Sequence, residues 1–173
     1  NRFVNLVEEG FDLVIRTGYL DDSSLIARHI LDSQWVICAA PAYVRRFGAP
    51  REPADLQAHN CLRYAYQSTG ASEWAFKGED GNYLVSVSGS FSTDNAGALR
   101  KAALGGRGIV YVPRCLVYHD LMSGNLVDLF PERVGKKLGI YAVYRFTRQP
   151  PRKIRMLIEH IRQRYLDIAH YFV

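Results

Sequence analysis

The chain has 173 residues, of which 48% are apolar, and its formal net charge is +5 at pH 7. This length and composition are typical of a globular protein with one domain or two small lobes. No apolar run approaches the roughly 20 residues that a membrane-spanning helix needs, and the first residues lack the apolar block of a secretory signal. We therefore expect no membrane partner.

The cysteines are Cys38, Cys61 and Cys115, which lie far apart and show no C-x-x-C spacing. An odd number with this spacing argues against both a disulfide framework and a zinc site. We expect three buried, reduced thiols in a cytoplasmic protein.

The first fifty residues read as alternating helices and strands. Apolar residues at helical spacing predict the end of a helix just before Gly10, while Pro41 suits the first turn of a helix that Gly48 ends. Short apolar runs between them predict strands. The expected elements are a helix over residues 3–9, strands over 11–16, 25–30 and 35–39, and a helix over 41–47.

A polar connection with two prolines follows, and we expect it to be a loop with one helical turn. Beyond it, residues 85–91 alternate apolar side chains with serine and glycine, as an antiparallel or edge strand does. The expected strands in this part of the chain cover residues 61–66, 72–76 and 85–91.

Residues 91–113 combine a polar loop, a short helix, a glycine turn and a buried strand. Thr93, Asp94 and Asn95 are good N-cap residues, so a helix that begins there directs free backbone N–H groups and its positive dipole end at whatever lies ahead. Small anions bind well at such a place. The pattern alone also fits an ordinary helix–strand unit with no ligand. We expect a helix closed by Gly105 and Gly106, then a strand over residues 109–112 that Pro113 ends.

The last third contains two helices and two strands. We expect a helix over residues 114–121 that ends near Gly124, strands over 126–130 and 138–144, and a long helix after Pro150 and Pro151. The apolar residues of this last helix form one continuous stripe, which we interpret as core packing. They are Ile154, Leu157, Ile158, Ile161, Tyr165, Ile168 and Phe172.

The alternation of short strands and helices predicts an α/β fold with a largely parallel sheet. The number of strands is too large for one small sheet in a chain of this length. Two lobes, each with its own sheet, fit better, and two lobes create a cleft between them.

Motifs of the common enzyme classes are missing from the sequence. It has no G-x-S-x-G elbow, phosphate-binding loop, H-E-x-x-H pair or dinucleotide glycine motif. The histidines are scattered, and the adjacent Asp21 and Asp22 point in opposite directions if their loop is extended. We expect no catalytic residue, no metal site and no cofactor, and hence no enzyme.

Positive charge is concentrated between residues 133 and 164, where lysines and arginines far outnumber acidic residues. A basic surface can bind phosphate or DNA. A solvated helix face is the commoner cause of such a run, and aromatic residues do not interleave with these charges as in single-strand binding. Both interpretations stay open.

Two groups of polar residues suit ligand recognition. Arg16 and Thr17 end a predicted strand, and residues 92–95 begin a predicted helix. Ligands of open α/β sheets bind beyond the carboxyl ends of the strands, where both groups would lie. The planar guanidinium of Arg16 suits a carboxylate. Alternatively, Arg16 pairs with Asp21 or Asp22 and only fixes its own loop.

A series of segments, in this order and spacing, resembles the LysR-type transcriptional regulators. The similarity matches the effector-binding region of that family and runs over nearly the whole chain. The segments are DLVIRTG, SSLIARHI, VICAAPAYV, PREPADLQAHNCL, WAF, STDN, AALGGRGIVYVP and SGNLVDLFPE.

The resemblance implies an α/β fold like that of the type 2 periplasmic binding proteins. In that fold, two Rossmann-like lobes are joined by two crossover strands and hold a small molecule between them. Mapped onto this sequence, the first lobe takes residues 1–34 and 139–173, and the second takes residues 35–138. The crossovers would lie near residues 33–36 and 138–144.

The sequence departs from the family pattern in two ways. The family carries an N-terminal winged helix-turn-helix that reads DNA, and nothing in this chain resembles it, so DNA is an expected partner of the parent protein only. The first lobe of the family also begins with a strand, a helix and a strand that we do not find here. We therefore expect an N-terminally truncated chain with an incomplete first lobe.

The resemblance implies an effector-sensing regulatory domain that binds a small, anionic metabolite in the cleft and forms a homo-dimer or tetramer. A free-standing solute-binding protein of the same fold is the alternative. The residues that would line the effector site are Arg16, Thr17, Gly18, Arg63, Thr93, Asp94, Asn95, Pro113 and Tyr144.

Overall fold

The computed structural model describes residues 10–18, 25–65, 70–145 and 151–173. The chain divides into two compact units: residues 1–33 with 137–173 form the first, and residues 34–136 form the second. The helix predicted over residues 3–9 lies outside the described residues, as do Asp21 and Asp22.

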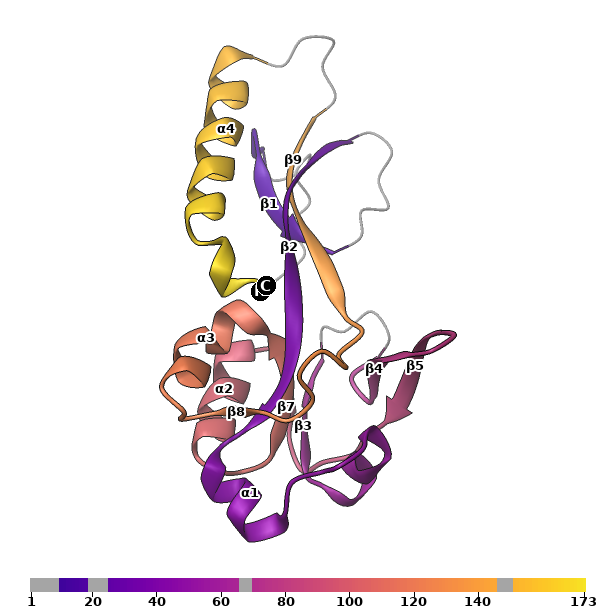
Figure 1. The fold of residues 1–173 in the computed structure, drawn as a ribbon. Coiled ribbons are helices and arrows are strands. Elements are labelled where there is room, and N and C mark those ends of the chain that lie inside the picture. Colours follow the sequence, from indigo (N-terminus) through magenta and orange to yellow (C-terminus); the bar gives the residue numbers. More distant parts are fainter. Residues whose placement is uncertain (1–9, 19–24, 66–69, 146–150) are drawn as a thin grey trace. The chain divides into compact units, whose positions relative to one another are not determined.

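The described residues of the first unit form strands and a long helix (Figure 1). β1 (Val14–Thr17) pairs antiparallel with β9 (Lys137–Arg145), and β9 is in turn a neighbour of β2 (Leu25–Ala39), whose first nine residues belong to this unit. α4 (Arg152–Asp167) and the short 3-10 helix η2 (Ala169–Tyr171) complete it. Ile154, Ile158 and Phe172 bury their side chains in this unit.

The apolar stripe predicted on the final helix is only partly buried. Leu157 and Ile168 leave 44% and 38% of their surface exposed. The apolar stripe is wider than the set of side chains that is buried, because a single layer of strands covers only one side of a helix. The interpretation of the whole stripe as core packing is therefore wrong.

The second unit is built on four neighbouring strands in the order β2, β7, β3, β6. The end of β2 pairs antiparallel with β7 (Ile109–Pro113) and with β8 (Val127–Asp128). β3 (Cys61–Tyr64) pairs parallel with β7 and with β6 (Ser92–Thr93). β7 is apolar along its whole length and buried except at Pro113, so it forms the centre of the core.

Helices cover this sheet, and the sequence signals for them are confirmed. α1 (Pro41–Phe47) begins with proline, and Gly48 ends it at a φ of 83°. η1 (Pro53–Ala58) is the helical turn expected in the polar connection. α2 (Ala96–Leu104) packs on β3 and β7 and against α3 (Arg114–Met122).

A separate hairpin completes the second unit. β4 (Glu73–Gly78) and β5 (Gly81–Ser86) pair antiparallel from Glu73 opposite Ser86 to Gly78 opposite Gly81. The strand predicted over residues 85–91 is thus wrong, since β5 ends at Ser86. The chain beyond it leaves the hairpin to reach β3, where Ser88 O accepts a hydrogen bond from Cys61 N at 3.0 Å.

Three further predictions about strands need correction. The sheet is mixed and not largely parallel: β3 pairs parallel with β6 and β7, which α2 links as a crossover helix, whereas β2 pairs antiparallel with β7. The strands predicted over 25–30 and 35–39 are one strand, since the residues between them, three of which are polar, stay extended in a strand that lies beside β9. The strand predicted over 126–130 shortens to Val127–Asp128.

All three cysteines are free thiols, as expected. Cys38 and Cys61 are buried as predicted, whereas Cys115 is only half-buried, so the prediction is wrong for that residue. Burial raises the pKa of Cys61 to about 12 and that of Cys38 further, so both thiols stay protonated at neutral pH.

Candidate functional site

In the second unit, the structure brings Arg63 together with the segment that precedes α2. Arg63 lies opposite Ser92 in the parallel pair of β3 and β6, and Tyr64 lies opposite Thr93. The N–H groups of Arg63 and Ala65 donate to Phe91 O and Thr93 O, both at 2.9 Å. The carboxyl end of β3 and the start of α2 are therefore neighbours, as ligand sites of α/β sheets require.

The predicted N-cap is present at Asn95. Its Oδ1 accepts a hydrogen bond from Ala98 N at 3.2 Å, and its own N–H donates to Thr93 Oγ1 at 3.1 Å. Asp94 and Asn95 are exposed. The remaining N–H groups of the first turn can donate hydrogen bonds to a small anion here, and the positive end of the helix dipole favours its negative charge.

The guanidinium of Arg63 connects β3 to the segments on either side of the hairpin. Nη1 donates to Ser72 Oγ at 3.2 Å, and Nη2 donates to Gly89 O at 3.5 Å. Within the described ranges of the chain, its buried Nε has no hydrogen-bond partner. Arg63 therefore contributes positive charge to this end of the sheet and one donor that is still available.

In the first unit, Arg16, Thr17 and Gly18 lie along β9. Arg16 is half-buried opposite Tyr141, Thr17 is exposed opposite Ile140, and Gly18 N donates to Gly139 O at 3.0 Å. Gly18 has a φ of 99°, which favours glycine. It lines a pocket of about 240 Å³ with Asp32, Lys137, Leu138, Gly139 and Tyr141.

That pocket has a charged wall. Lys137 Nζ lies 2.9 Å from one carboxylate oxygen of Asp32, and His29 Nε2 lies 2.7 Å from the other. Hydrogen bonds from Lys137 first, and from His29 second, hold the pKa of Asp32 below its ordinary value. Asp32 thus stays ionised and paired at neutral pH.

The other two predicted effector residues, Tyr144 and Pro113, lie on β9 and at the end of β7. Tyr144 is buried on β9 and lines another pocket of the first unit, of about 270 Å³, with Phe11, Arg145 and Ile154 among others. Pro113 is half-buried at the end of β7 opposite Trp35, and it directly precedes α3.

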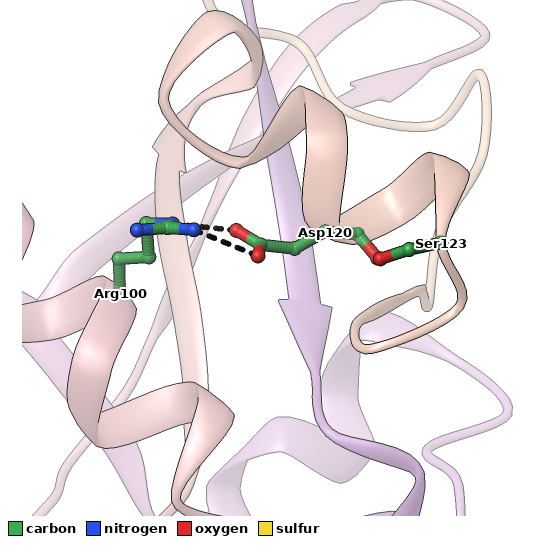
Figure 2. A network of polar contacts seen from close by, with 3 residues as sticks. All are labelled: Arg100, Asp120 and Ser123. Atoms are coloured by element: carbon green, nitrogen blue, oxygen red, sulfur yellow. Dashed lines mark hydrogen bonds and ion pairs between the residues drawn. The ribbon is translucent and has the colours of Figure 1, made fainter.

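The polar pair that holds α2 in place was not predicted. Arg100 on α2 donates from Nε to Asp120 Oδ2 at 2.5 Å and from Nη2 to Asp120 Oδ1 at 2.8 Å (Figure 2). Asp120 on α3 is only 5% exposed, and its backbone oxygen also accepts from Ser123 Oγ at 3.2 Å. The pair raises the pKa of Arg100. The arginine and aspartate lie twenty residues apart, so no local spacing signals it.

A buried lysine is the other feature that sequence reasoning missed. Lys136 is 9% exposed, and its Nζ lies 3.6 Å from the centre of the Trp35 ring. Burial lowers the pKa of Lys136 to about 8. In the sequence, Lys136 and Lys137 look like a charged turn, and only the alternation of a following strand could have indicated that one of them points inward.

Among residues 10–18, 25–65, 70–145 and 151–173, no group of three His, Cys, Asp or Glu side chains is placed to hold a metal ion. No helix in the described part of the chain is long and apolar enough to cross a membrane.

The sequence model of the protein family described as the LysR substrate binding domain matches residues 1–166 of this chain. The chain belongs to the LysR substrate-binding domain family. It is 30% identical over 168 residues to the HTH-type transcriptional activator AaeR of Escherichia coli K12, covering 97% of this chain and 54% of AaeR. It is 31% identical over 160 residues to the HTH-type transcriptional regulator CrgA of Neisseria meningitidis serogroup B, covering 92% of this chain and 53% of CrgA. The chain thus spans about half the length of these relatives.

Solved structures of LysR-type regulators share the fold. The regulatory domain of CrgA superposes with a TM-score of 0.81 at 30% identity, covering 95% of this chain and 80% of that domain. Full-length AphB of Vibrio cholerae gives a TM-score of 0.77 at 26% identity, over 91% of this chain and 53% of AphB. The predicted family and its α/β fold class are confirmed, and these relatives favour a regulatory domain over a free-standing solute-binding protein.

Proposed function

We propose that this LysR substrate-binding domain senses a small anionic metabolite and that the whole protein uses this signal to control transcription. The proposal rests mainly on the position of the segment Thr93–Asn95: it precedes α2 and lies beside Arg63 at the carboxyl end of β3. The capped helix start supplies N–H donors, and Arg63 supplies positive charge. This combination favours a carboxylate or another small oxyanion over a cation.

The first unit offers a second group of donors for the same effector. Arg16 and Thr17 at the end of β1, together with Gly18, have the chemistry to hold another polar group of the ligand. That these residues and those at α2 contact one effector molecule, in a cleft between two lobes, stays a prediction.

The remaining partners follow from the relatives. AaeR and CrgA are HTH-type regulators, and this chain spans about half of their length. We infer that a DNA-binding part of the whole protein lies outside these residues, that the protein acts in the cytoplasm as a homo-dimer or tetramer, and that the domain binds its effector without transforming it.

A calorimetric screen tests the effector site. The 173-residue chain is titrated with a panel of small carboxylic and phosphorylated metabolites, and each hit is repeated with Asn95→Asp. Aspartate keeps the N-cap acceptor, but its negative charge repels an anion, so we expect affinity to fall about tenfold or more while thermal stability is retained. Arg16→Ala should weaken the same ligand.

Arg155→Ala is the matched control for charge, because Arg155 is exposed on α4. It should leave affinity unchanged. Unchanged affinity in both Asn95→Asp and Arg16→Ala would refute the placement of the effector. A screen in which no anion binds would refute the proposed function itself.

A further inference from the structure

The first unit contains a pocket of about 240 Å³ that we call the Asp32 pocket. Three neighbouring strands build it: Asp32 lies on β2, four of the lining residues lie on β9, and Gly18 directly follows β1. Pockets for drug-sized ligands have roughly 300 to 1,000 Å³, so this pocket suits a smaller metabolite. Its lining residues are Gly18, Asp32, Lys137, Leu138, Gly139 and Tyr141.

One wall of the pocket is an aromatic ring that its neighbours hold in place. A Cβ atom on Gly139 would overlap the ring and the hydroxyl of Tyr141, so this ring lies directly over the Gly139 backbone. The ring of His29 meets that of Tyr141 edge-on, with 5.3 Å between the ring centres. Gly18 N donates to Gly139 O at 3.0 Å, which joins two backbone segments of the wall. An apolar part of a ligand would therefore find a preformed surface on the ring.

The charged part of the pocket is an ion pair that a ligand can open. Lys137 Nζ lies 2.9 Å from Asp32 Oδ2, and the two side chains are 59% and 37% exposed. Exposed pairs of this kind stabilise a fold little, and the flexible stem of lysine allows its ammonium group to move away. His29 Nε2 lies 2.7 Å from Asp32 Oδ1, so that oxygen keeps its contact when Lys137 moves. Opening the pair therefore presents one carboxylate oxygen and one ammonium group to the pocket.

The two opposite charges select the kind of molecule that can replace this pair. A ligand with only a carboxylate would pair with Lys137, but Asp32 would then repel it without Lys137 to compensate. A ligand with only an ammonium group would leave Lys137 without its anion. A zwitterion supplies a partner to both charges. We propose that the Asp32 pocket binds an α-amino acid, whose ammonium group pairs with Asp32, whose carboxylate pairs with Lys137 and whose side chain packs on Tyr141.

NMR titration of the isotope-labelled 173-residue chain at pH 7 and constant ionic strength tests this proposal. The ligands share one side chain: L-leucine carries both charges, isocaproate lacks the ammonium group, and isoamylamine lacks the carboxylate. We expect the backbone N–H signals of Gly18 and Gly139 to shift saturably with leucine, with a Kd of about 1 mM. Each of the two analogues should bind about tenfold more weakly or worse, because it leaves one charge of the pocket without a partner.

Asp32→Asn keeps the shape of the side chain and removes its charge. Leucine affinity should fall about tenfold or more in this variant. The variant should also bind isocaproate at least as tightly as leucine, because the charge that repels a lone carboxylate is gone. A reversed preference of this kind cannot come from a loss of fold. Asp12→Asn is the matched control, because Asp12 forms an exposed pair with Lys153 at the same distance of 2.9 Å. It should bind leucine like the unmodified chain.

Three results would overturn the assignment: no saturable shift with leucine, alanine or phenylalanine, equal affinities for isocaproate and leucine, or unchanged leucine affinity in Asp32→Asn. The second comparison needs no variant, so it decides the matter even if Asp32→Asn does not fold. A loss of affinity in Asp12→Asn would place the amino acid at the other pocket, which Asp12 lines, and would also overturn the assignment. All lining residues of the Asp32 pocket belong to the first unit, so these failures would leave the anion site proposed at Arg63 and Asn95 standing.

Discussion

Two buried charges of the second unit are held in different ways. The carboxylate of Asp120 meets the guanidinium of Arg100 in two hydrogen bonds, which satisfy both of its oxygens with an opposite charge. The ammonium of Lys136 lies on the faces of Trp35 and Tyr111, which are uncharged. The pairing with Arg100 stabilises the ionised form of Asp120. The burial of the Lys136 ammonium costs folding free energy while the side chain is charged, so the stability of the domain depends on pH.

Asp120→Asn should destabilise the domain by about 2 kcal/mol, because the amide cannot accept both hydrogen bonds and Arg100 loses its counter-charge. Urea unfolding followed by circular dichroism measures the free energy of unfolding. Arg164→Ala removes only an exposed pair with Asp167 and should leave that free energy unchanged. A loss in Asp120→Asn no larger than in this control would contradict the prediction.

Above pH 8, the titration of Lys136 should change the free energy of unfolding of the domain. Its pKa is about 8 in the folded chain and 10.5 ordinarily, so between these values the unfolded chain binds more protons. The free energy of unfolding contributed by Lys136 therefore rises with pH across that window, by up to about 3 kcal/mol.

Comparison with Lys136→Met isolates this contribution, because tyrosines and cysteines that titrate in the same range affect both proteins. The stability advantage of Lys136→Met over the unmodified chain should be largest at pH 7 and shrink as pH rises to 10.5. Urea unfolding at a series of pH values measures it. A difference that is independent of pH would show that burial does not lower the pKa of Lys136.

At the scale of elements, the segment of residues 88–90, which precedes β6, packs with its backbone directly against the backbone of β3. Gly89 lies against β3, where a Cβ atom would overlap the carbonyl oxygen of Cys61. Ser88 O and Asn60 Oδ1 hold the same segment through hydrogen bonds with Cys61 N and Ser90 N. This contact aligns β6 with β3 and thereby places Asn95.

Gly89→Ala should therefore destabilise the domain by about 2 kcal/mol or more, since backbone must move to admit the methyl group. Gly105→Ala is the control, because Gly105 has a φ of −74° and its nearest neighbour would be Lys101 O at an ordinary 3.4 Å. Thermal unfolding measures both variants. Equal stability in the two would contradict the close approach at Gly89.

Sequence patterns predicted the helices well and the strands less well. Pro41 with Gly48, and the N-cap Asn95, act through local backbone chemistry, so their helices could be read directly. Strand limits depend on partners far along the chain. The alternation from Val85 onward continues past the hairpin, and the polar residues 32–34 stay extended because β2 lies beside β9.

The candidate site shows the same division. Thr93 and Asn95 could be predicted, because an N-cap is a local signal. The burial of Lys136 could not, because the rings that it contacts come from β2 and β7 and only folding brings them together. The same holds for the bidentate pair of Arg100 and Asp120, which joins two helices.

At the scale of the whole molecule, the outer surface of α4 bears on self-association. Met156, Leu157 and Leu166 are exposed on this helix among several arginines. Exposed apolar side chains of this size are suited to an interface with another protein surface. In the proposed homo-oligomer, α4 is therefore a natural contact.

Leu157→Glu should weaken self-association about tenfold or more, because it places a charge in an apolar contact. Sedimentation equilibrium measures the association constant. Gln163→Glu adds the same charge at an exposed polar position of α4 and should have little effect. A chain that stays monomeric at about 100 μM would count against α4 as the contact.

Lys136 and Lys137 are adjacent in sequence but have opposite surroundings: one ammonium lies on the ring of Trp35, and the other pairs with Asp32. Successive residues of an extended chain face opposite sides, so a slip of one residue would exchange the two lysines. One lysine would then take the place of the other, so either Asp32 would lose its partner or Trp35 would lose its cation. The two adjacent lysines therefore help to fix the register of this segment. Deletion of one lysine should destabilise the domain far more than its replacement does.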